Sequence, residues 1–289
     1  MIDKLALGTA QFGLNYGIAN NKGQVKLSEI DCILNYANSQ GINTIDTAIA
    51  YGDSEAQLGK VGINGWRVIS KLPPLSNQCP NIRQWVYQSV EASLERLKIP
   101  CLYGLLLHKP NQLNEDRGAE LYEALTEMES SSMVEQTGIS VYETDELSLI
   151  DELTGLSIVQ VPFNLIDTRF ENFFKKLKEN GNQVHVRSAF LQGLLLMERE
   201  ERPKKFSRWE SIWDSYEEFL KQSGTTRLEA CINYVLSFIE VDNVIVGVDS
   251  LEQLKEICAA ADKKNIVYPD FFKNQDAELI NPALWSTFE

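Results

Sequence analysis

The chain has 289 residues, of which 44% are hydrophobic and 24% are charged, a composition typical of a globular protein with a large apolar core. Its formal charge of -14 disfavours nucleic acid and anionic membrane surfaces as partners. No basic region precedes a long apolar stretch at the N-terminus, and no apolar run approaches the ~18 residues that a membrane-spanning helix needs. These observations predict a cytoplasmic protein that binds neither nucleic acid nor a membrane.

Cysteine and histidine are sparse and scattered. Five cysteines lie far apart without a CxxC pair, which predicts reduced, mostly buried thiols. The two histidines, His108 and His185, belong to no Cys/His cluster. Because a structural zinc site needs such a cluster, no metal site is expected.

Short β-like runs alternate with helix-period stretches along the chain. The β-like runs fall near 4–8, 43–46, 67–71, 102–107, 134–140, 157–161, 183–188 and 243–247. The helical stretches cover 27–41, 54–62, 81–99, 119–131, 143–155, 170–181, a pair of helices within 209–239, and 251–264. Eight strands alternating with eight helical units predict an α/β fold, the (β/α)8 or TIM barrel. Since no Ser/Gly/Pro-rich linker divides the chain, one domain is predicted over residues 1–289.

Four polar residues lie where β-like runs give way to loops. Asp46 ends the second run, Lys71 the third and His108 follows the fourth, while Tyr51 lies in the loop after Asp46. In a parallel barrel these ends meet at the C-terminal mouth, where active sites lie. An ammonium ~4 Å from a phenol contributes about 4 kcal/mol at an effective dielectric of about 20, which would bring the phenol's pKa from ~10 toward neutrality.

This chemistry predicts a proton donor for a carbonyl oxygen. Tyr51 would give the proton, Lys71 would tune its pKa, Asp46 would hold the ammonium, and His108 would orient the carbonyl by a hydrogen bond. Each residue alone also has an ordinary structural explanation, such as a lid on the core or a solvated charge. Their joint placement favours catalysis. Two alternatives stay open: a regulatory barrel that binds a nucleotide without turnover, and a Schiff-base lyase or aldolase with Lys71 as nucleophile.

The chain resembles the aldo-keto reductase superfamily over nearly its whole length. The similar motifs are NTIDTAIAYGDSEAQLGK (43–60), SLERLKI (93–99), LLLHKP (105–110), TGIS (137–140), VQVPFNLID (159–167), VRSAFLQGLL (186–195) and VIVGVDSLEQLKE (244–256). The resemblance implies a (β/α)8 barrel, NAD(P)H-dependent reduction of a carbonyl, and the same four catalytic residues. The opening GTAQFGLNYG (8–17) is similar to bacterial members associated with carbohydrate metabolism, which indicates a sugar-derived aldehyde or ketone as a candidate substrate.

The resemblance also implies where the nicotinamide end of a cofactor binds. Ser140 and Gln160 match residues that hold the carboxamide. Val141 replaces the Asn that usually follows the Ser, and Asn164 is a candidate to compensate for it. Arg187 matches the position that stacks on the nicotinamide.

A pyrophosphate loop is implied next. Ser188 begins it, and the backbone N–H groups of residues 189–194 would bind the phosphates, with Gly193 permitting close approach. The alternative for this stretch is a plain exit from a strand into a loop.

The adenosine end is implied by four further positions: Gly247, Asp249, Gln253 and Glu256. NADP-specific members place Lys or Arg among these positions, and this chain has none there. NADP is the usual cofactor of the family, whereas the residues at these positions favour either weak discrimination between NADP and NAD or a preference for NAD. Asp249 would either accept hydrogen bonds from an unphosphorylated ribose or cap the following helix. The predicted cofactor is NADP, with NAD as the alternative.

Substrate choice is expected to depend on loops over the mouth, at 109–118 and 162–172, and on the C-terminal tail. Aromatic side chains in the tail would either line the pocket or pack the tail onto the barrel: Tyr268, Phe271, Phe272, Trp285 and Phe288.

Overall fold

The computed structural model describes residues 1–20, 22–261, 266–269 and 276–285. Eight parallel strands form a closed barrel in sequential order, and the last strand pairs with the first. The strands are β1 (Leu5–Gly8), β2 (Thr44–Asp46), β3 (Arg67–Leu72), β4 (Leu102–Leu107), β5 (Val134–Ser140), β6 (Leu156–Pro162), β7 (Gln183–Arg187) and β8 (Val241–Gly247). The predicted (β/α)8 barrel is confirmed.

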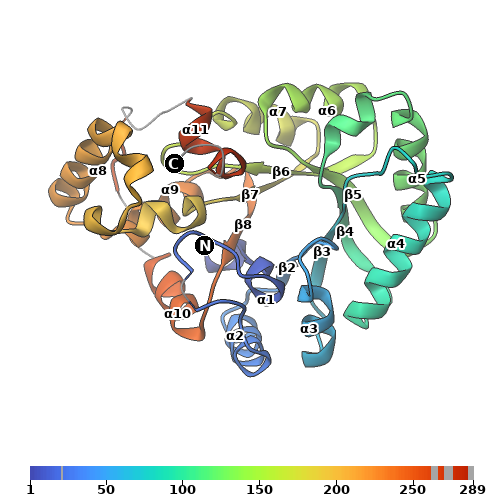
Figure 1. Cartoon of the computed structure of the whole chain (residues 1–289), viewed down its shortest axis with the longest axis horizontal. Helices are drawn as coiled ribbons and strands as arrows, with labels where there is room; N and C mark the ends of the chain where they lie inside the picture. Colours follow the sequence, from blue (N-terminus) through green and yellow to red (C-terminus); the bar gives the residue numbers. More distant parts are fainter. Residues whose placement is uncertain (21, 262–265, 270–275, 286–289) are drawn as a thin grey trace.

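Helices surround the strands on the outside (Figure 1). They are α1 (Ala10–Gly13), α2 (Leu27–Ser39), α3 (Ser54–Val61), α4 (Ile82–Leu97), α5 (Gly118–Ser130), α6 (Ser148–Glu152), α7 (Phe174–Glu179), α8 (Glu210–Ser223), α9 (Arg227–Leu236), α10 (Leu251–Ala260) and α11 (Ala277–Ile280). The helices predicted over 143–155 and 170–181 are shorter than expected, because each begins with a turn of 3-10 helix, at Thr144–Leu147 and Glu171–Phe173.

The two-residue period of the strands decides what lies inside the barrel. Along β3, Arg67, Ile69 and Lys71 share one side of the strand and therefore occupy successive levels of the interior. Ile69 packs with Leu106 and Ile158 in a small apolar cluster of fully buried side chains. This cluster separates Lys71, at the C-terminal mouth, from Arg67 at the opposite end.

The five cysteines form no disulfide, but the prediction that most are buried is wrong. Only Cys231 and Cys258 are buried, and Cys32 is exposed because its helix position faces solvent. In the part of the chain that the structure describes, no helix is both long and apolar enough to cross a membrane. Location in the cytoplasm stays a prediction.

Candidate active site

A buried ion pair lies at the mouth of the barrel. The Nζ of Lys71 donates to Oδ1 of Asp46 at 2.6 Å and to the backbone carbonyl of Thr47 at 2.8 Å. Both charged side chains are at most 5% exposed. Burial lowers the pKa of Lys71, and the Asp46 carboxylate opposes that change. The strand ends therefore position this pair as predicted.

A chain of amide and hydroxyl groups continues from the pair to neighbouring strands. Nε2 of Gln160 donates to Oδ2 of Asp46 at 2.7 Å. The Ser140 hydroxyl donates to Oε1 of Gln160 at 3.1 Å. Ser140 and Gln160, predicted as contacts of a cofactor carboxamide, are thus also coupled to the carboxylate of the predicted catalytic group.

Tyr51 and His108 face each other beside the pair. Their rings make an edge-on contact with centroids 6.0 Å apart, and Nζ of Lys71 lies 5.4 Å from the Tyr51 ring centroid. Burial raises the pKa of the Tyr51 phenol well above its usual range, and the Asp46 carboxylate raises it further. The expectation of a phenol with a pKa near neutrality is therefore wrong for this structure. The reason is that Asp46 largely cancels the charge of Lys71, so burial decides the direction.

The imidazole of His108 is neutral at physiological pH. Burial and the positive charges of Lys71 and Arg187 lower its pKa to about 4. A neutral imidazole carries one N–H donor and one acceptor nitrogen. It is therefore suited to a hydrogen bond with a carbonyl oxygen, as predicted for His108.

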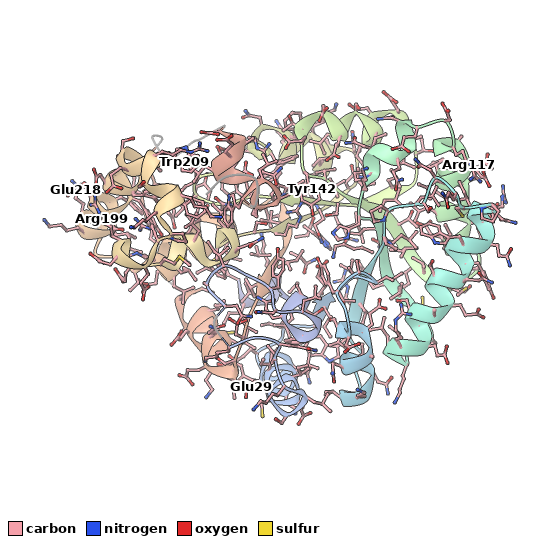
Figure 2. The ribbon with its side chains drawn as sticks, in the orientation of Figure 1. Glu29, Arg117, Tyr142, Arg199, Trp209 and Glu218 are labelled. Atoms are coloured by element: carbon pink, nitrogen blue, oxygen red, sulfur yellow. The ribbon has the colours of Figure 1, made fainter. Side chains whose placement is uncertain are left out.

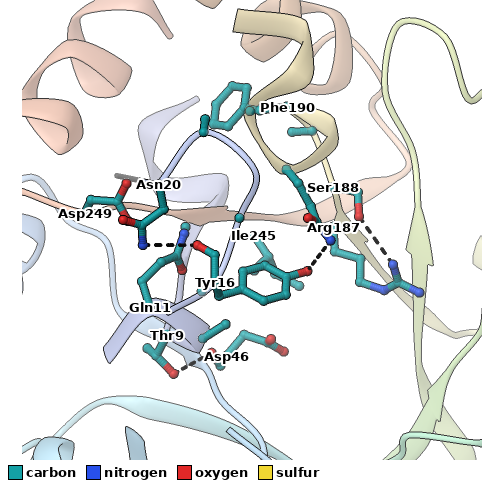
Figure 3. Close-up of a pocket in the computed structure, with 18 of the residues that line it drawn as sticks. Thr9, Gln11, Tyr16, Asn20, Asp46, Arg187, Ser188, Phe190, Ile245 and Asp249 are labelled. Atoms are coloured by element: carbon teal, nitrogen blue, oxygen red, sulfur yellow. Dashed lines mark hydrogen bonds between the residues drawn. The ribbon is translucent and has the colours of Figure 1, made fainter. Parts of the chain in front are cut away.

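A cavity of about 320 Å³ opens above these groups. Its lining contains every predicted site residue except Lys71, which lies behind Asp46. The lining residues predicted from the sequence are Asp46, Tyr51, His108, Ser140, Gln160, Arg187, Ser188, Gly193, Gly247, Asp249, Gln253 and Glu256. Figure 3 shows Arg187 and Asp249 on opposite sides of this cavity, with Tyr16 between them. The structure thus brings the predicted catalytic and cofactor residues to one elongated pocket.

Several lining residues were missed by the sequence reasoning: Thr9, Gln11, Tyr16, Asn20, Tyr142 and Gln192. Most come from residues 9–20, the loop after β1, whose GTAQFGLNYG motif was used only as a hint about substrate. The placement of βα loops at the mouth would have identified them. The Tyr16 hydroxyl accepts a hydrogen bond from Nε2 of Gln192 at 3.2 Å, so this loop reaches across the pocket (Figure 3).

The guanidinium of Arg187 stacks over the Tyr142 ring, 4.1 Å from its centroid. It donates to the carbonyl of Val141 at 2.8 Å and to the Ser188 hydroxyl at 3.3 Å, while its Nε has no partner among the described residues. Figure 2 shows Tyr142 near the middle of the molecule, in contrast to the peripheral Arg199. Arg187 therefore presents its charge beside the catalytic end of the cavity.

The interpretation of residues 189–194 as free phosphate donors needs correction. The N–H groups of Leu191 and Gly193 already donate to the carbonyls of Ser188 and Phe190, both at 2.9 Å. Gly193 has a φ of 90°, and a Cβ there would lie 2.5 Å from Cβ of Ala19. A glycine is thus required at this position by the backbone and by the loop after β1.

Asn164 does not compensate for Val141, contrary to the expectation. It is fully buried and does not line the cavity. Its Nδ2 donates to the carbonyl of Ser188, and its Oδ1 accepts from the N–H groups of Ile166 and Asp167. The bonds to Ile166 and Asp167 fix the turn after β6, and the bond to Ser188 ties this turn to the end of β7.

Two of the tail aromatics pack onto the barrel. The Tyr268 hydroxyl donates to the carbonyl of Ala230 at 3.0 Å, and the buried Trp285 makes an edge-on contact with Phe206. Neither lines the cavity. Phe271, Phe272 and Phe288 lie outside the described residues.

Comparison with known proteins identifies the family of this chain. Residues 4–271 match the model of the aldo/keto reductase family. Because the match covers most of the sequence, the chain belongs to this family, and it is an oxidoreductase of the class that uses NADH or NADPH.

Two proteins of similar sequence support the assignment. The uncharacterized oxidoreductase YqkF of Bacillus subtilis is 25% identical over 256 residues, which are 81% of this chain and 82% of that protein. D-arabinose 1-dehydrogenase of Saccharomyces cerevisiae is 23% identical over 250 residues, which are 78% of this chain and 74% of that protein.

Solved structures share the fold. An aldo-keto reductase from Bacillus halodurans in its holo form has a TM-score of 0.71 at 20% identity, with 91% of this chain and 88% of that chain covered. A glycerol dehydrogenase from Gluconobacter oxydans has a TM-score of 0.70 with the same identity and coverage.

Proposed function

We propose that this protein reduces an aldehyde or ketone to an alcohol with NADH or NADPH, and that Tyr51 gives the proton to the carbonyl oxygen. The observation that carries the proposal is the grouping of Tyr51 and His108 at a cavity lined by Asp46, whose carboxylate holds Lys71 behind the wall. This set of groups can hold a carbonyl oxygen and protonate it.

The groups that line the cavity suit a nicotinamide dinucleotide. It is lined by residues of several βα loops, and it contains the buried Oδ1 of Asp249, which has no hydrogen-bond partner among the described residues. Ser140 and Gln160 would hold the carboxamide of the nicotinamide. Arg187 and Ser188 would contact the part of the cofactor between the nicotinamide and the phosphates. When bound, the cofactor supplies the hydride that the carbonyl carbon receives.

Each residue at the mouth has its own proposed role in the proton transfer. The neutral His108 would donate its N–H to the carbonyl oxygen and align it with the Tyr51 hydroxyl. Lys71, held by Asp46, would stabilise the tyrosinate as the proton leaves. The raised pKa of Tyr51 keeps its proton in place until negative charge develops on the substrate oxygen.

We propose a polyhydroxylated or sugar-derived carbonyl compound as the substrate. The yeast relative is named for a pentose, and the catalytic end of the cavity offers polar groups from Tyr16, Tyr142 and Arg187. Such groups can bind hydroxyl oxygens of a sugar. Turnover of a panel of aldoses, ketoses and simple aldehydes tests this choice.

Replacement of one hydroxyl tests the catalytic role. Tyr51→Phe should lower kcat by about a thousandfold or more while leaving nucleotide affinity nearly unchanged, because the lost group acts in the transition state. Tyr103→Phe is the matched control: it lies on β4 at the other end of the barrel, where its hydroxyl pairs with Gln183. Retention of more than about a tenth of the turnover by Tyr51→Phe would reject the proposed donor.

The two alternatives make different predictions. A Schiff-base enzyme needs an accessible amine, but Lys71 is 1% exposed and is held by Asp46 and Thr47. Borohydride trapping of a substrate on Lys71 would support that alternative. A regulatory barrel would bind the nucleotide without turnover, and the panel assay separates it from a reductase.

A further inference from the structure

The N-terminus of helix α10 lies at the predicted adenosine end of the cavity, and side chains of this chain occupy two of its first three backbone N–H groups. The N–H of Leu251 donates to Oε1 of Glu29 at 2.6 Å, and the N–H of Asp249 donates to Oε1 of Gln253 at 2.7 Å. The Ser250 hydroxyl accepts from the N–H of Gln253 at 3.4 Å and caps the helix. The beginning of a helix otherwise offers such groups to an anion.

Glu29 reaches this point from a different element. It lies in α2, which is far from α10 in the sequence but adjacent to it around the barrel (Figure 1). Its carboxylate therefore places a negative charge where the first turn of α10 would otherwise attract one.

The charges that line the cavity differ between its two ends. Asp249 and Glu256 line the adenosine end, and Oδ1 of Asp249 is buried without a partner among the described residues. Arg187 is the only lysine or arginine among the described lining residues, and it lies on the opposite side (Figure 3). The charge of Lys22 acts on Asp249, but this lysine is exposed and does not line the cavity. Its effect on a phosphate would be weakened by water and salt.

Given the proposed reductase function, on which this step rests, we infer that the pocket selects NAD(H) over NADP(H). Asp249 accepts hydrogen bonds from the ribose hydroxyls, while Glu29 and Gln253 occupy the N–H groups that would hold a 2′-phosphate. The phosphate would meet the Asp249 carboxylate in the cavity wall and no lining cation at this end, while Glu29, outside the lining, holds the N–H of Leu251. An unphosphorylated ribose instead offers its hydroxyl groups as donors to a carboxylate, as it does in NAD-specific Rossmann folds.

Equilibrium binding measures this selection without turnover. Isothermal titration of the wild-type protein with NADH and NADPH should give at least about tenfold tighter binding of NADH, since a charge-assisted contact changes affinity about ten- to a hundredfold. ADP and 2′,5′-ADP probe the same end without the nicotinamide and should follow the same order.

Two variants assign the selection to the named groups. Asp249→Asn should reduce the preference for NADH by about tenfold, because it removes the repelling charge and weakens the acceptor. Glu29→Gln should strengthen NADPH binding by about threefold or more and leave NADH binding within about twofold. The matched control is Glu252→Gln, a 72% exposed acid in the first turn of the same helix, which should leave the preference unchanged.

The outcomes separate this inference from the function on which it rests. Tighter binding of NADPH than NADH by the wild-type protein overturns the inference and leaves the reductase proposal intact. An unchanged preference in Asp249→Asn also overturns it. Failure of both nucleotides to bind overturns the proposed function, and the inference falls with it.

Discussion

Replacing Lys71 with methionine should destabilise the protein far more than loss of an exposed ion pair. The ammonium lies 2.6 Å from Oδ1 of Asp46, and both side chains are buried. At an effective dielectric of about 20, their gross attraction is about 6 kcal/mol. Part of that attraction offsets the desolvation of Lys71. After the replacement, Gln160 remains the only described side chain that donates to the carboxylate. We expect a loss of about 3 to 5 kcal/mol in the free energy of unfolding.

Urea unfolding of three variants provides the test. Lys71→Met should show the full loss, whereas adding Asp46→Asn should recover at least half of it because the buried charge is removed. Lys176→Met is the matched control, since Lys176 is also 2.6 Å from a carboxylate, that of Asp151, but on the surface. It should cost less than about 1 kcal/mol. Equal losses for Lys71→Met and Lys176→Met would refute the reasoning.

Three further predictions concern the barrel interior and the cavity. Gln160→Leu removes a donor to Asp46 and should cost about 1 to 3 kcal/mol of stability in urea unfolding; no loss would show that water replaces it. Gly193→Ala should lower both the melting temperature and nucleotide affinity, because a Cβ would meet Ala19; unchanged values of both would contradict the contact. Burial lowers the pKa of His185 to about 3 in the folded protein, whereas this side chain has a pKa of about 6.5 when the chain is unfolded. Between these two pH values His185 binds a proton in the unfolded state but not in the folded state. Stability should therefore fall as pH decreases through that window, by at most about 1.4 kcal/mol per pH unit, and His185→Gln should flatten the slope measured by urea unfolding between pH 4.5 and 6.5.

The barrel and the grouping at its mouth were predictable because both follow from short-range patterns. A parallel strand that is buried on both faces has an almost continuously apolar sequence. A polar residue that ends such a strand therefore lies at the C-terminal edge of the barrel. Asp46 and Lys71 end their runs in this way, which is why their pairing could be expected before any coordinates were known.

The raised pKa of Tyr51 was not predictable from the same patterns. A sequence shows that a cation and a phenol lie at one mouth, but it does not show how tightly another residue neutralises that cation. In the structure Asp46 is 2.6 Å from Lys71, whereas the Tyr51 ring centroid is 5.4 Å from the same Nζ. The balance between burial and charge therefore depends on distances that only the folded chain sets.

Long-range contacts explain the other differences. Gly193 was interpreted through a phosphate, but its neighbour in space is Ala19, which is distant in the sequence. The sequence predicts Asn164 as a substitute for the absent Asn at the carboxamide, but its amide bonds to the turn in which it lies and to the carbonyl of Ser188 after β7. Short polar side chains in turns commonly bond to nearby backbone, and Asn164 follows this pattern.

In the proposed reaction, the resting site holds the one proton that the carbonyl oxygen takes from the protein and a separate N–H group that binds this oxygen. Burial keeps Tyr51 protonated, and the depressed pKa of His108, about 4, leaves its imidazole neutral with one N–H. Two positive charges act at this end: Lys71 and Arg187 both lower the pKa of His108, and Arg187 also opposes the rise in the pKa of Tyr51. The mouth therefore combines a buried ion pair, Asp46–Lys71, with a further cation, Arg187. In the proposed reaction, such an arrangement would stabilise the charge that develops on Tyr51 during proton transfer without ionising the phenol beforehand.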